Sequence, residues 1–319
     1  MKPKVKHLRK RFKVKRVEIV APVHNRREIT LQCLRSLARL ADEKLEIHIV
    51  IVDDGSTDGT GEAIRKNFPD VELVEGDGNL WFTEGTNVGV RAALKHNPDY
   101  VLMINDDQVF DSKFLTCMVE TAEKYPRSVI GSLLLLWDTP HKLFQVAPVW
   151  KTWKGGWQLW DNQTIWTIPK KPWKVDIIVG NCLLVPVEAI REAGLMDSKR
   201  YPNFGDAEYT PRLKKKGWRL LIEPRARVFC QPNAIPKRVT SMGLKEKVDA
   251  LFINLKHTQN LRRRFFMHLD SAPTKLHGLS GFVIFFIKLG WQKATGKTSL
   301  PNERETDISI LFADAVVKD

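Results

Sequence analysis

Two adjacent carboxylates follow an apolar run in the segment YVLMINDDQVF, residues 100–110. The run YVLMI is typical of a buried strand, and Asn105, Asp106 and Asp107 come directly after it. Neighbouring carboxylates repel each other and are costly to remove from water, so they need either a solvated turn or a cation. Hard oxygen ligands suit Mg²⁺ or Mn²⁺. One interpretation is a divalent metal site with Asp107 as ligand, and the alternative is a solvated turn that caps the next helix.

A second pair of carboxylates, Asp53 and Asp54, lies in VDDGSTDGT, residues 52–60. The pair follows another apolar run, and the Gly-Ser-Thr-Asp after it is typical of a helix start. Together these residues offer acceptors for a nucleobase edge or a ribose next to the N-terminus of a helix. The alternative is an ordinary strand-to-helix turn in which Asp54 or Ser56 caps the helix.

The third segment is GDGNLWFTEGTNVGVRAAL, residues 76–94, which contains Asn79 and Asn87. Glycines and short polar residues before a helix allow the backbone to approach a diphosphate closely. The segment differs from the glycine fingerprint of dinucleotide-binding folds, and it lacks the lysine of a Walker loop. It is therefore a candidate for part of a phosphate-binding site of another class.

Strands and helices must alternate to position these segments. Apolar runs at 17–23, 46–52, 71–75 and 100–104 predict strands, and residues 27–40, 57–67, 84–96 and 114–124 predict helices. This alternation indicates an α/β fold with a mostly parallel sheet covered by helices. Ligands on such sheets bind beyond the carboxyl ends of the strands. We therefore expect the segment PVHNR, residues 22–26, to share one crevice with the two acidic pairs.

After Leu136 the pattern changes, and seven of the ten tryptophans lie between Trp137 and Trp173. Scattered glycines and prolines among them predict β-hairpins or long loops. The alternation then resumes with a strand at 175–186, helices at 187–194 and 206–216, and a strand at 218–224. We divide the chain into a basic arm (1–16), a catalytic domain (17–236) with nucleotide-binding (17–136) and acceptor (137–236) halves, and a C-terminal helical segment and tail (237–319).

Composition narrows the protein class. With 43% hydrophobic and 28% charged residues the chain is globular, and its net charge is +14. Nine Lys or Arg fall within residues 2–16, an arm that can meet nucleic acid, anionic lipid or only solvent. The four cysteines lack paired metal-ligand spacing, no secretory signal is visible, and the apolar run 281–287 is too short to span a bilayer. We expect a cytoplasmic protein, with peripheral attachment to the inner face of the membrane as an option.

In their order and spacing these motifs resemble the inverting GT-A glycosyltransferases of family 2, in the rhamnosyltransferase-like branch. The family motif P-x-[YH]-N is matched at residues 22–25, V-D-D-G-S at 52–56, and the metal motif N-x-D at 105–107. The resemblance continues through GNCLLVPVEAIREAGLMD and FGDAEYTPRLKKKGW, so it extends over residues 17–229.

The resemblance implies a UDP- or dTDP-sugar donor, a glycan or lipid-linked acceptor in cell envelope polysaccharide synthesis, and Mg²⁺ or Mn²⁺ on Asp107. It implies that Asp206 removes the proton of the acceptor hydroxyl as this attacks the anomeric carbon. Arg212 either assists the leaving diphosphate or pairs with Asp206 or Glu208. The predicted donor-binding residues are Pro22, His24, Asn25, Arg26, Asp53, Asp54, Asn79, Asn87, Asn105, Asp106 and Arg212.

Two positions depart from the family pattern. Gly205 occupies the place of the glutamate that precedes the catalytic aspartate, and Cys230-Gln231-Pro232 stands where many relatives have a histidine. The metal would then be held by Asp107, the diphosphate and water alone.

Two other functions remain as alternatives. A nucleotidyltransferase shares the fold style and the metal carboxylates, but it usually has a glycine-rich loop after the first strand, which PVHNRRE lacks. A basic nucleic-acid-binding protein would explain the arm and the tryptophans. It would leave the clustered acids unexplained, so we do not expect nucleic acid as a partner.

Overall fold

The computed structural model describes residues 14–145, 149–158, 163–180, 182–230, 242–257 and 259–295. Most of the predicted basic arm and the predicted boundary at residue 236 therefore lie outside the described residues. The first strand, β1 (Lys15–Val23), already includes the last two residues of the predicted arm. The Lys15 ammonium lies 2.9 Å from the Glu123 carboxylate, and the Arg16 N–H donates to Asp99.

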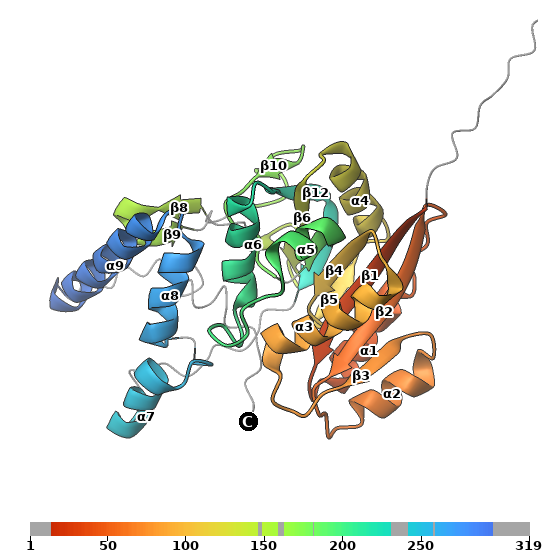
Figure 1. Ribbon diagram of the computed structural model, residues 1–319, viewed down its shortest axis with the longest axis horizontal. Helices are drawn as coiled ribbons and strands as arrows, with labels where there is room; N and C mark the ends of the chain where they lie inside the picture. The colour runs from red at the N-terminus through yellow and green to blue at the C-terminus, as the bar shows by residue number, and fades with distance from the viewer. Residues whose placement is uncertain are drawn as a thin grey trace, which may run out of the picture.

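The described strands form one large mixed sheet and a separate hairpin (Figure 1). The parallel part of the large sheet has the order β4-β1-β2-β3. Antiparallel β11 joins this part to β6, and β6 runs parallel to β12. The edge strand β10 pairs with β12, as does β5, and β7 pairs with β6. The bounds are β2 (Leu45–Asp53), β3 (Glu72–Glu75), β4 (Tyr100–Ile104), β5 (Gln108–Phe110), β6 (Ser128–Leu136), β7 (Leu143–Gln145), β10 (Trp173–Lys174), β11 (Cys182–Pro186) and β12 (Arg219–Cys230).

Helices cover both faces of this sheet, as the alternation predicts. In β4, Leu102 packs with the helices of one face, and its neighbour Val101 packs with those of the other. The first face carries α1 (Arg27–Leu37), α2 (Thr60–Asn67) and α4 (Phe114–Lys124). The second carries α3 (Trp81–Ala93), α5 (Val187–Ala193) and α6 (Gly205–Lys215). Strand β6 is absent from the predicted elements, because a continuous apolar run has no period that separates strand from helix.

The tryptophan-rich segment packs against the C-terminal helices. Its hairpin of β8 (Val149–Lys151) and β9 (Gly156–Gln158) is joined by the short helix η2 (Thr152–Lys154). The hairpin lies on α8 (Leu261–Ser271) and α9 (Lys275–Thr295), and α7 (Leu244–Val248) and η4 (Asp249–Ile253) precede them (Figure 1). The Trp157 indole is buried and donates to Ser271 over 3.0 Å. Within the described residues, no helix is both long and apolar enough to cross a bilayer.

Candidate active site

The sheet register brings the predicted residues to one edge. Val23 at the end of β1 pairs with Asp53 at the end of β2, and β4 runs parallel beside them. Strand β11 enters from this same edge, because Cys182 pairs with Ile104, the last residue of β4. Gly180 therefore lies beyond the end of β4, next to the position of the Asn105–Asp107 segment. The Gly180 N–H donates to Asp206 Oδ2 over 2.7 Å, which places Asp206 at the same edge.

Arg26 is the cation that compensates the two adjacent carboxylates of the segment after β4. One guanidinium nitrogen lies 2.9 Å from Asp106 Oδ1, and another lies 3.1 Å from Asp107 Oδ2. The Thr30 hydroxyl also donates to Asp106, over 2.8 Å. Burial still raises the pKa of Asp106 to about 6, although the Arg26 charge opposes that shift. The solvated turn considered from the sequence is therefore not what the chain forms, because both carboxylates are buried and paired.

Two oxygens of the N-x-D motif fit a hard divalent cation. Asp107 Oδ1 and Asn105 Oδ1 are both buried and without a hydrogen-bond partner, although Asp107 Oδ2 is paired with Arg26. An uncompensated buried oxygen is costly, and Mg²⁺ and Mn²⁺ favour carboxylate and amide oxygens. The residues present thus suit the metal that the sequence predicts at Asp107.

Asp54 organises the loop that precedes α3. Its Oδ1 accepts from the N–H groups of Gly78 (2.8 Å) and Leu80 (3.2 Å), and its Oδ2 accepts from Trp81 (3.0 Å). The neighbouring Asp53 accepts from the Ser56 N–H over 3.1 Å. Both carboxylates thus accept hydrogen bonds from backbone N–H groups of the site, and the Asp54 side chain holds the glycine loop in place.

His24 and Asn25 join the first two strand-to-helix turns. His24 Nδ1 donates to the Asp54 carbonyl (2.5 Å), and its Nε2 accepts from the Asn25 amide (3.0 Å). The Asn25 Oδ1 in turn accepts from the Thr57 N–H over 2.7 Å. Asn25 has a φ of 50°, in the left-handed region that asparagine tolerates better than most residues. Pro22 lies at the end of β1 under α3, where an added Cβ on Gly85 would stand 2.8 Å from it.

Asp206 is a buried carboxyl at the start of α6. Burial raises its pKa to about 6, although the Gly180 N–H favours the charged form. Among the described residues no cation pairs with it in a salt bridge. A carboxyl with a pKa near 6 is ionised at neutral pH and accepts a proton more readily than an exposed aspartate.

Steric contacts explain why the residue before Asp206 is a glycine. A Cβ at Gly205 would lie 2.4 Å from Thr83 Cγ2 and 3.0 Å from Met196 Cβ. The Thr83 hydroxyl accepts from the Gly205 N–H (3.1 Å) and donates to the Tyr201 carbonyl (2.5 Å). The close contact between α3 and α6 therefore leaves no room for the glutamate of the family pattern.

Three predicted donor residues make other contacts. Arg212 pairs with Glu208 (2.6 Å) and donates to the carbonyl of Leu195 (2.8 Å), so it ties α6 to the loop after α5. The Asn87 amide accepts from the Met196 N–H and donates to the Met196 carbonyl, both at 3.0 Å. The Asn79 side chain is exposed on the glycine loop and donates weakly to the Asp77 carbonyl. Of the three, only Asn79 stands at the strand ends with a side chain that faces solvent.

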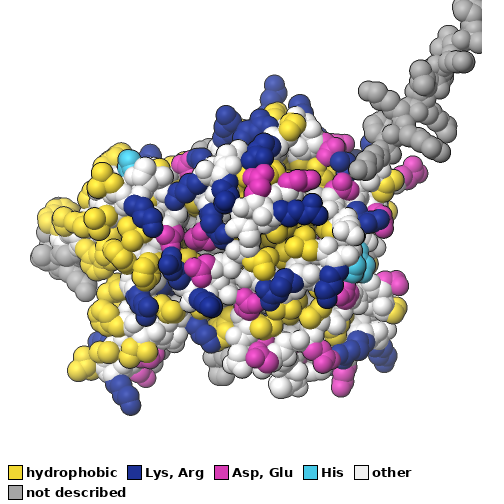
Figure 2. All heavy atoms as spheres, in the orientation of Figure 1, with side chains coloured by type: hydrophobic (Ala, Val, Ile, Leu, Met, Phe, Trp, Pro, Cys, Tyr) yellow, Lys and Arg dark blue, Asp and Glu magenta, His cyan; other side chains and the backbone are white. Residues whose placement is uncertain are grey.

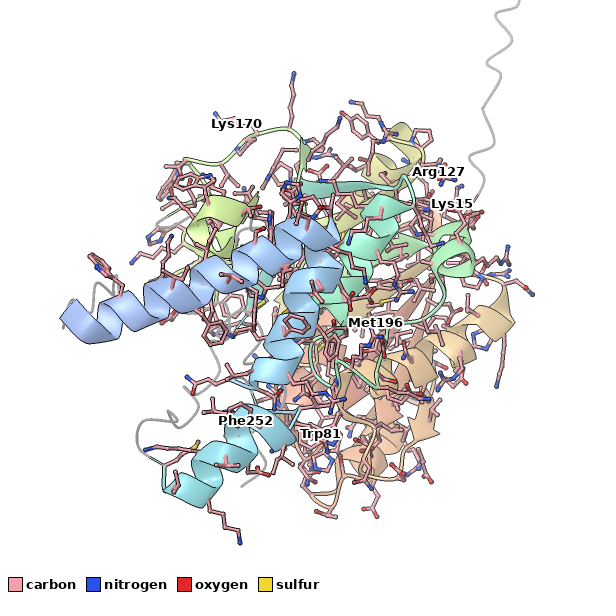
Figure 3. All side chains as sticks on the ribbon, turned by 60° about the vertical axis from the view of Figure 1, so that its left-hand side comes forward. Lys15, Trp81, Arg127, Lys170, Met196 and Phe252 are labelled. Atoms are coloured by element: carbon pink, nitrogen blue, oxygen red, sulfur yellow. The ribbon has the colours of Figure 1, made fainter. Side chains whose placement is uncertain are left out.

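Two side chains that sequence reasoning did not name, Trp81 and Gln108, lie next to the predicted segments. Trp81, the first residue of α3, lies with its ring 3.6 Å from the Lys256 ammonium. Figure 3 shows Trp81 beside the segment that carries Phe252, below α8. Gln108 Nε2 donates to Cys230 Sγ over 3.5 Å, and its Oε1 is buried without a partner. No local motif signals Trp81 or Gln108, because their neighbours come from distant parts of the chain.

Comparisons with known proteins identify sequences that resemble this chain. Residues 18–155 match the model of glycosyl transferase family 2. An N-acetylglucosaminyl-diphospho-decaprenol L-rhamnosyltransferase of Mycobacterium tuberculosis is 26% identical over 213 residues, which cover 60% of this chain and 68% of the relative.

Solved structures share the fold. GalNAc-T7 with UDP, GalNAc and Mn²⁺ superimposes with a TM-score of 0.56 and 15% identity, over 90% of this chain and 59% of that one. The mannosyltransferase PcManGT of Pyrobaculum calidifontis, in complex with GDP-Man and Mn²⁺, gives 0.51 and 16%, over 94% and 86%. The α/β sheet with helices on both faces is the GT-A fold, and the C-terminal helices follow it.

Proposed function

We propose that this glycosyltransferase with a GT-A fold, whose residues 18–155 belong to family 2, is an inverting enzyme. It moves one sugar from a nucleotide diphosphate to a lipid-linked acceptor. The donor is a UDP- or dTDP-sugar, and the acceptor is a sugar on a polyprenyl diphosphate of cell envelope synthesis. The rhamnosyltransferase of Mycobacterium tuberculosis supports this choice. Residues 17–136 bind the nucleotide, and residues 137–236 face the acceptor.

The observation that carries the proposal is the buried carboxyl of Asp206 at the edge where the N-x-D motif ends. An inverting transfer needs a base that removes the acceptor proton as the hydroxyl attacks the anomeric carbon, on the side opposite the departing nucleotide. Asp206 has the pKa for this task, about 6, and one of its oxygens is held by the Gly180 N–H. That hydrogen bond orients the carboxylate.

The N-x-D motif, Arg26 and the glycine loop act on the leaving nucleotide. Asn105 Oδ1 and Asp107 Oδ1 would hold Mg²⁺ or Mn²⁺, which offsets the charge on the departing diphosphate when bound. Arg26 holds Asp106 and Asp107 in place through ion pairs, and it leaves Asp107 Oδ1 free for the cation. The glycine loop fixed by Asp54 presents backbone groups beside the nucleotide.

An apolar surface on the C-terminal helices suits an acceptor carried by a lipid. Exposed apolar side chains recur every three or four residues along α9, at Leu276, Leu279, Val283, Ile287 and Trp291. Figure 2 shows apolar side chains gathered over the part of the molecule that holds α7, α8 and α9. An apolar helix face on a chain of net charge +14 favours anionic membrane surfaces. We propose that this face rests on the membrane while the site meets the acceptor headgroup.

The test is a donor panel. The protein is incubated with UDP-, dTDP- and GDP-sugars and Mn²⁺ or Mg²⁺, together with a polyprenyl-diphosphate-linked sugar. Formation of an elongated lipid-linked product from one pyrimidine nucleotide sugar, with inverted anomeric configuration by NMR, supports the proposal. A retained configuration, or no binding of any nucleotide sugar, would refute it.

A further inference from the structure

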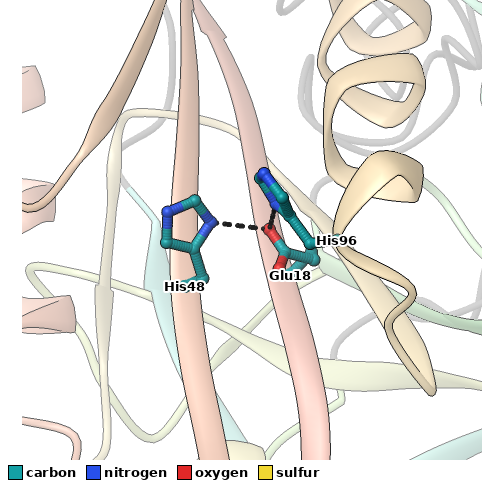
Figure 4. Close-up of side chains that lie close together, drawn as sticks. All are labelled: Glu18, His48 and His96. Carbon is teal, nitrogen blue, oxygen red and sulfur yellow. Dashed lines mark hydrogen bonds and ion pairs between the residues drawn. The ribbon is translucent and has the colours of Figure 1, made fainter.

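A second cluster of possible metal ligands lies on the sheet, in the amino-terminal half of its strands. Glu18 of β1 and His48 of β2 are direct partners in the parallel register, so their side chains share one face. Helix α3 covers that face and runs back toward the amino ends. The short helix η1 (Leu94–His96) follows α3 and brings His96 next to Glu18 and His48. Figure 4 shows the three side chains converging, with both imidazoles directed at the Glu18 carboxylate.

This cluster is separate from the candidate active site. Glu18 precedes Val23, the last residue of β1, by five positions. At about 3.3 Å per residue in a strand, that places the cluster roughly 16 Å from the carboxyl ends where Asp107 lies. A cation bound here would take no part in sugar transfer.

The distances fit a cation shared by the three side chains. His48 Nδ1 lies 2.8 Å and His96 Nδ1 lies 3.2 Å from the same oxygen, Glu18 Oε2. His96 Nδ1 is buried, yet it makes no hydrogen bond of acceptable geometry. One ligand atom from each residue lies within 4.8 Å of the others. Tetrahedral Zn²⁺ with bonds of about 2.0–2.1 Å separates its ligand atoms by about 3.3 Å, so only small shifts would be required.

The surroundings resemble those of a transition-metal site. The Glu18 side chain is 1% exposed and needs a compensating charge, whereas both imidazoles are 37% exposed, which leaves room for a water ligand. His96 Nε2 faces the Glu72 carboxylate at 3.4 Å, and metal-bound histidines commonly donate their second ring N–H to such a group. The Arg16 guanidinium donates to the His96 carbonyl over 2.8 Å and so fixes η1.

We propose that Glu18, His48 and His96 bind a divalent transition ion of the Zn²⁺ class, with Glu72 as the carboxylate that orients His96. Two imidazoles and one carboxylate suit Zn²⁺ better than the hard ions Mg²⁺ and Mn²⁺. The ion fastens the end of α3 to β1 and β2. The competing explanation is a metal-free cluster in which contacts from the two imidazoles alone stabilise the buried Glu18 side chain.

The experiment measures Zn²⁺ affinity of the full chain by calorimetry and records the visible spectrum of the Co²⁺ form. Four proteins are compared: wild type, His96→Asn, Glu72→Gln, and the control His277→Asn, whose histidine is exposed on α9. Glu72 is partly exposed and outside the core, so its variant is expected to fold. We expect tight binding in wild type and control, its loss in His96→Asn, and a 10–100-fold weaker affinity in Glu72→Gln.

X-ray absorption of the Zn²⁺ form provides a test that needs no variant. Two imidazole ligands and oxygen support the proposal, and a shell of oxygen alone would overturn it. Equal Zn²⁺ affinity in wild type and Glu72→Gln, or binding lost equally in the His277 control, would also overturn it. Because the readout is metal affinity, a failure here leaves the proposed sugar transfer untouched.

Discussion

Replacing Asp206 with asparagine should stabilise the protein and abolish transfer together. The pKa of this carboxyl is raised from 3.8 to about 6 in the folded state, because burial disfavours its charge. The folded state therefore holds the proton more tightly than the unfolded state, and stability falls as pH rises from about 4 to about 6. A difference of about two pH units corresponds to about 3 kcal/mol. Asparagine is neutral at every pH, and its amide oxygen can still accept from the Gly180 N–H.

We expect Asp206→Asn to be more stable than wild type by about 1–3 kcal/mol at pH 7–8 and equal to it near pH 4. Urea unfolding at pH 4, 5, 6, 7 and 8 measures this difference. The control is Asp70→Asn, since Asp70 is exposed before β3 and its removal should change stability little. Donor binding should survive in Asp206→Asn, whereas turnover should fall by about 10²–10⁴-fold, the usual loss for a missing general base.

Two results would refute this reasoning. If Asp206→Asn is less stable than wild type at pH 8, the carboxylate has a favourable partner that compensates its burial. If turnover is unchanged while the stability gain appears, Asp206 is a buried carboxyl without a role as base. The wild-type rate should also fall about tenfold between pH 7 and pH 5, as the carboxyl becomes protonated.

The remaining predictions concern the cation site, the helix contact and the membrane face. Asp107→Ala should weaken Mn²⁺-dependent donor binding about tenfold or more in calorimetry, and unchanged affinity would exclude Asp107 as a ligand. Arg26→Met should destabilise the fold by about 3 kcal/mol and increase the thermal stabilisation by Mn²⁺, since two carboxylates lose their counter-charge; an equal Mn²⁺ effect in both proteins would contradict this. Gly205→Ala should lower the free energy of unfolding, measured with urea, by about 1–3 kcal/mol. Gly243→Ala should lower it less, because an added Cβ there meets nothing. Equal decreases in the two variants would argue against the contact between α3 and α6. Val283→Asp should reduce sedimentation with anionic liposomes severalfold, and unchanged sedimentation would remove α9 from the membrane face.

Local patterns predicted most of the sheet and the edge at which the acidic segments end, because these features depend on neighbours in sequence. The alternation of apolar runs and helical periods gave β1 to β4 and the helices between them, and the comparisons confirm the GT-A fold. Strand β6 was not predicted, because its continuous apolar run has neither the two-residue period of a half-buried strand nor the period of a helix. The charge balance at Asp106 and Asp107 was not predicted either, since Arg26 precedes them by 80 and 81 positions.

Side-chain direction was the least predictable property of the site. Sequence placed Asn87 and Arg212 with the donor residues, but both bond to the chain between α5 and α6. The reason for Gly205 could not be read from its neighbours either, since it lies in the contact with Thr83 on α3. Such features depend on which distant elements meet.

The three N–H groups gathered by the Asp54 carboxylate have a consequence for donor recognition. The glycine loop is shaped before any ligand arrives, so its ordering entropy is lost during folding rather than at the moment of association. A rigid template of this kind discriminates by shape, and its selectivity would be altered by replacing side chains around it rather than by lengthening the loop.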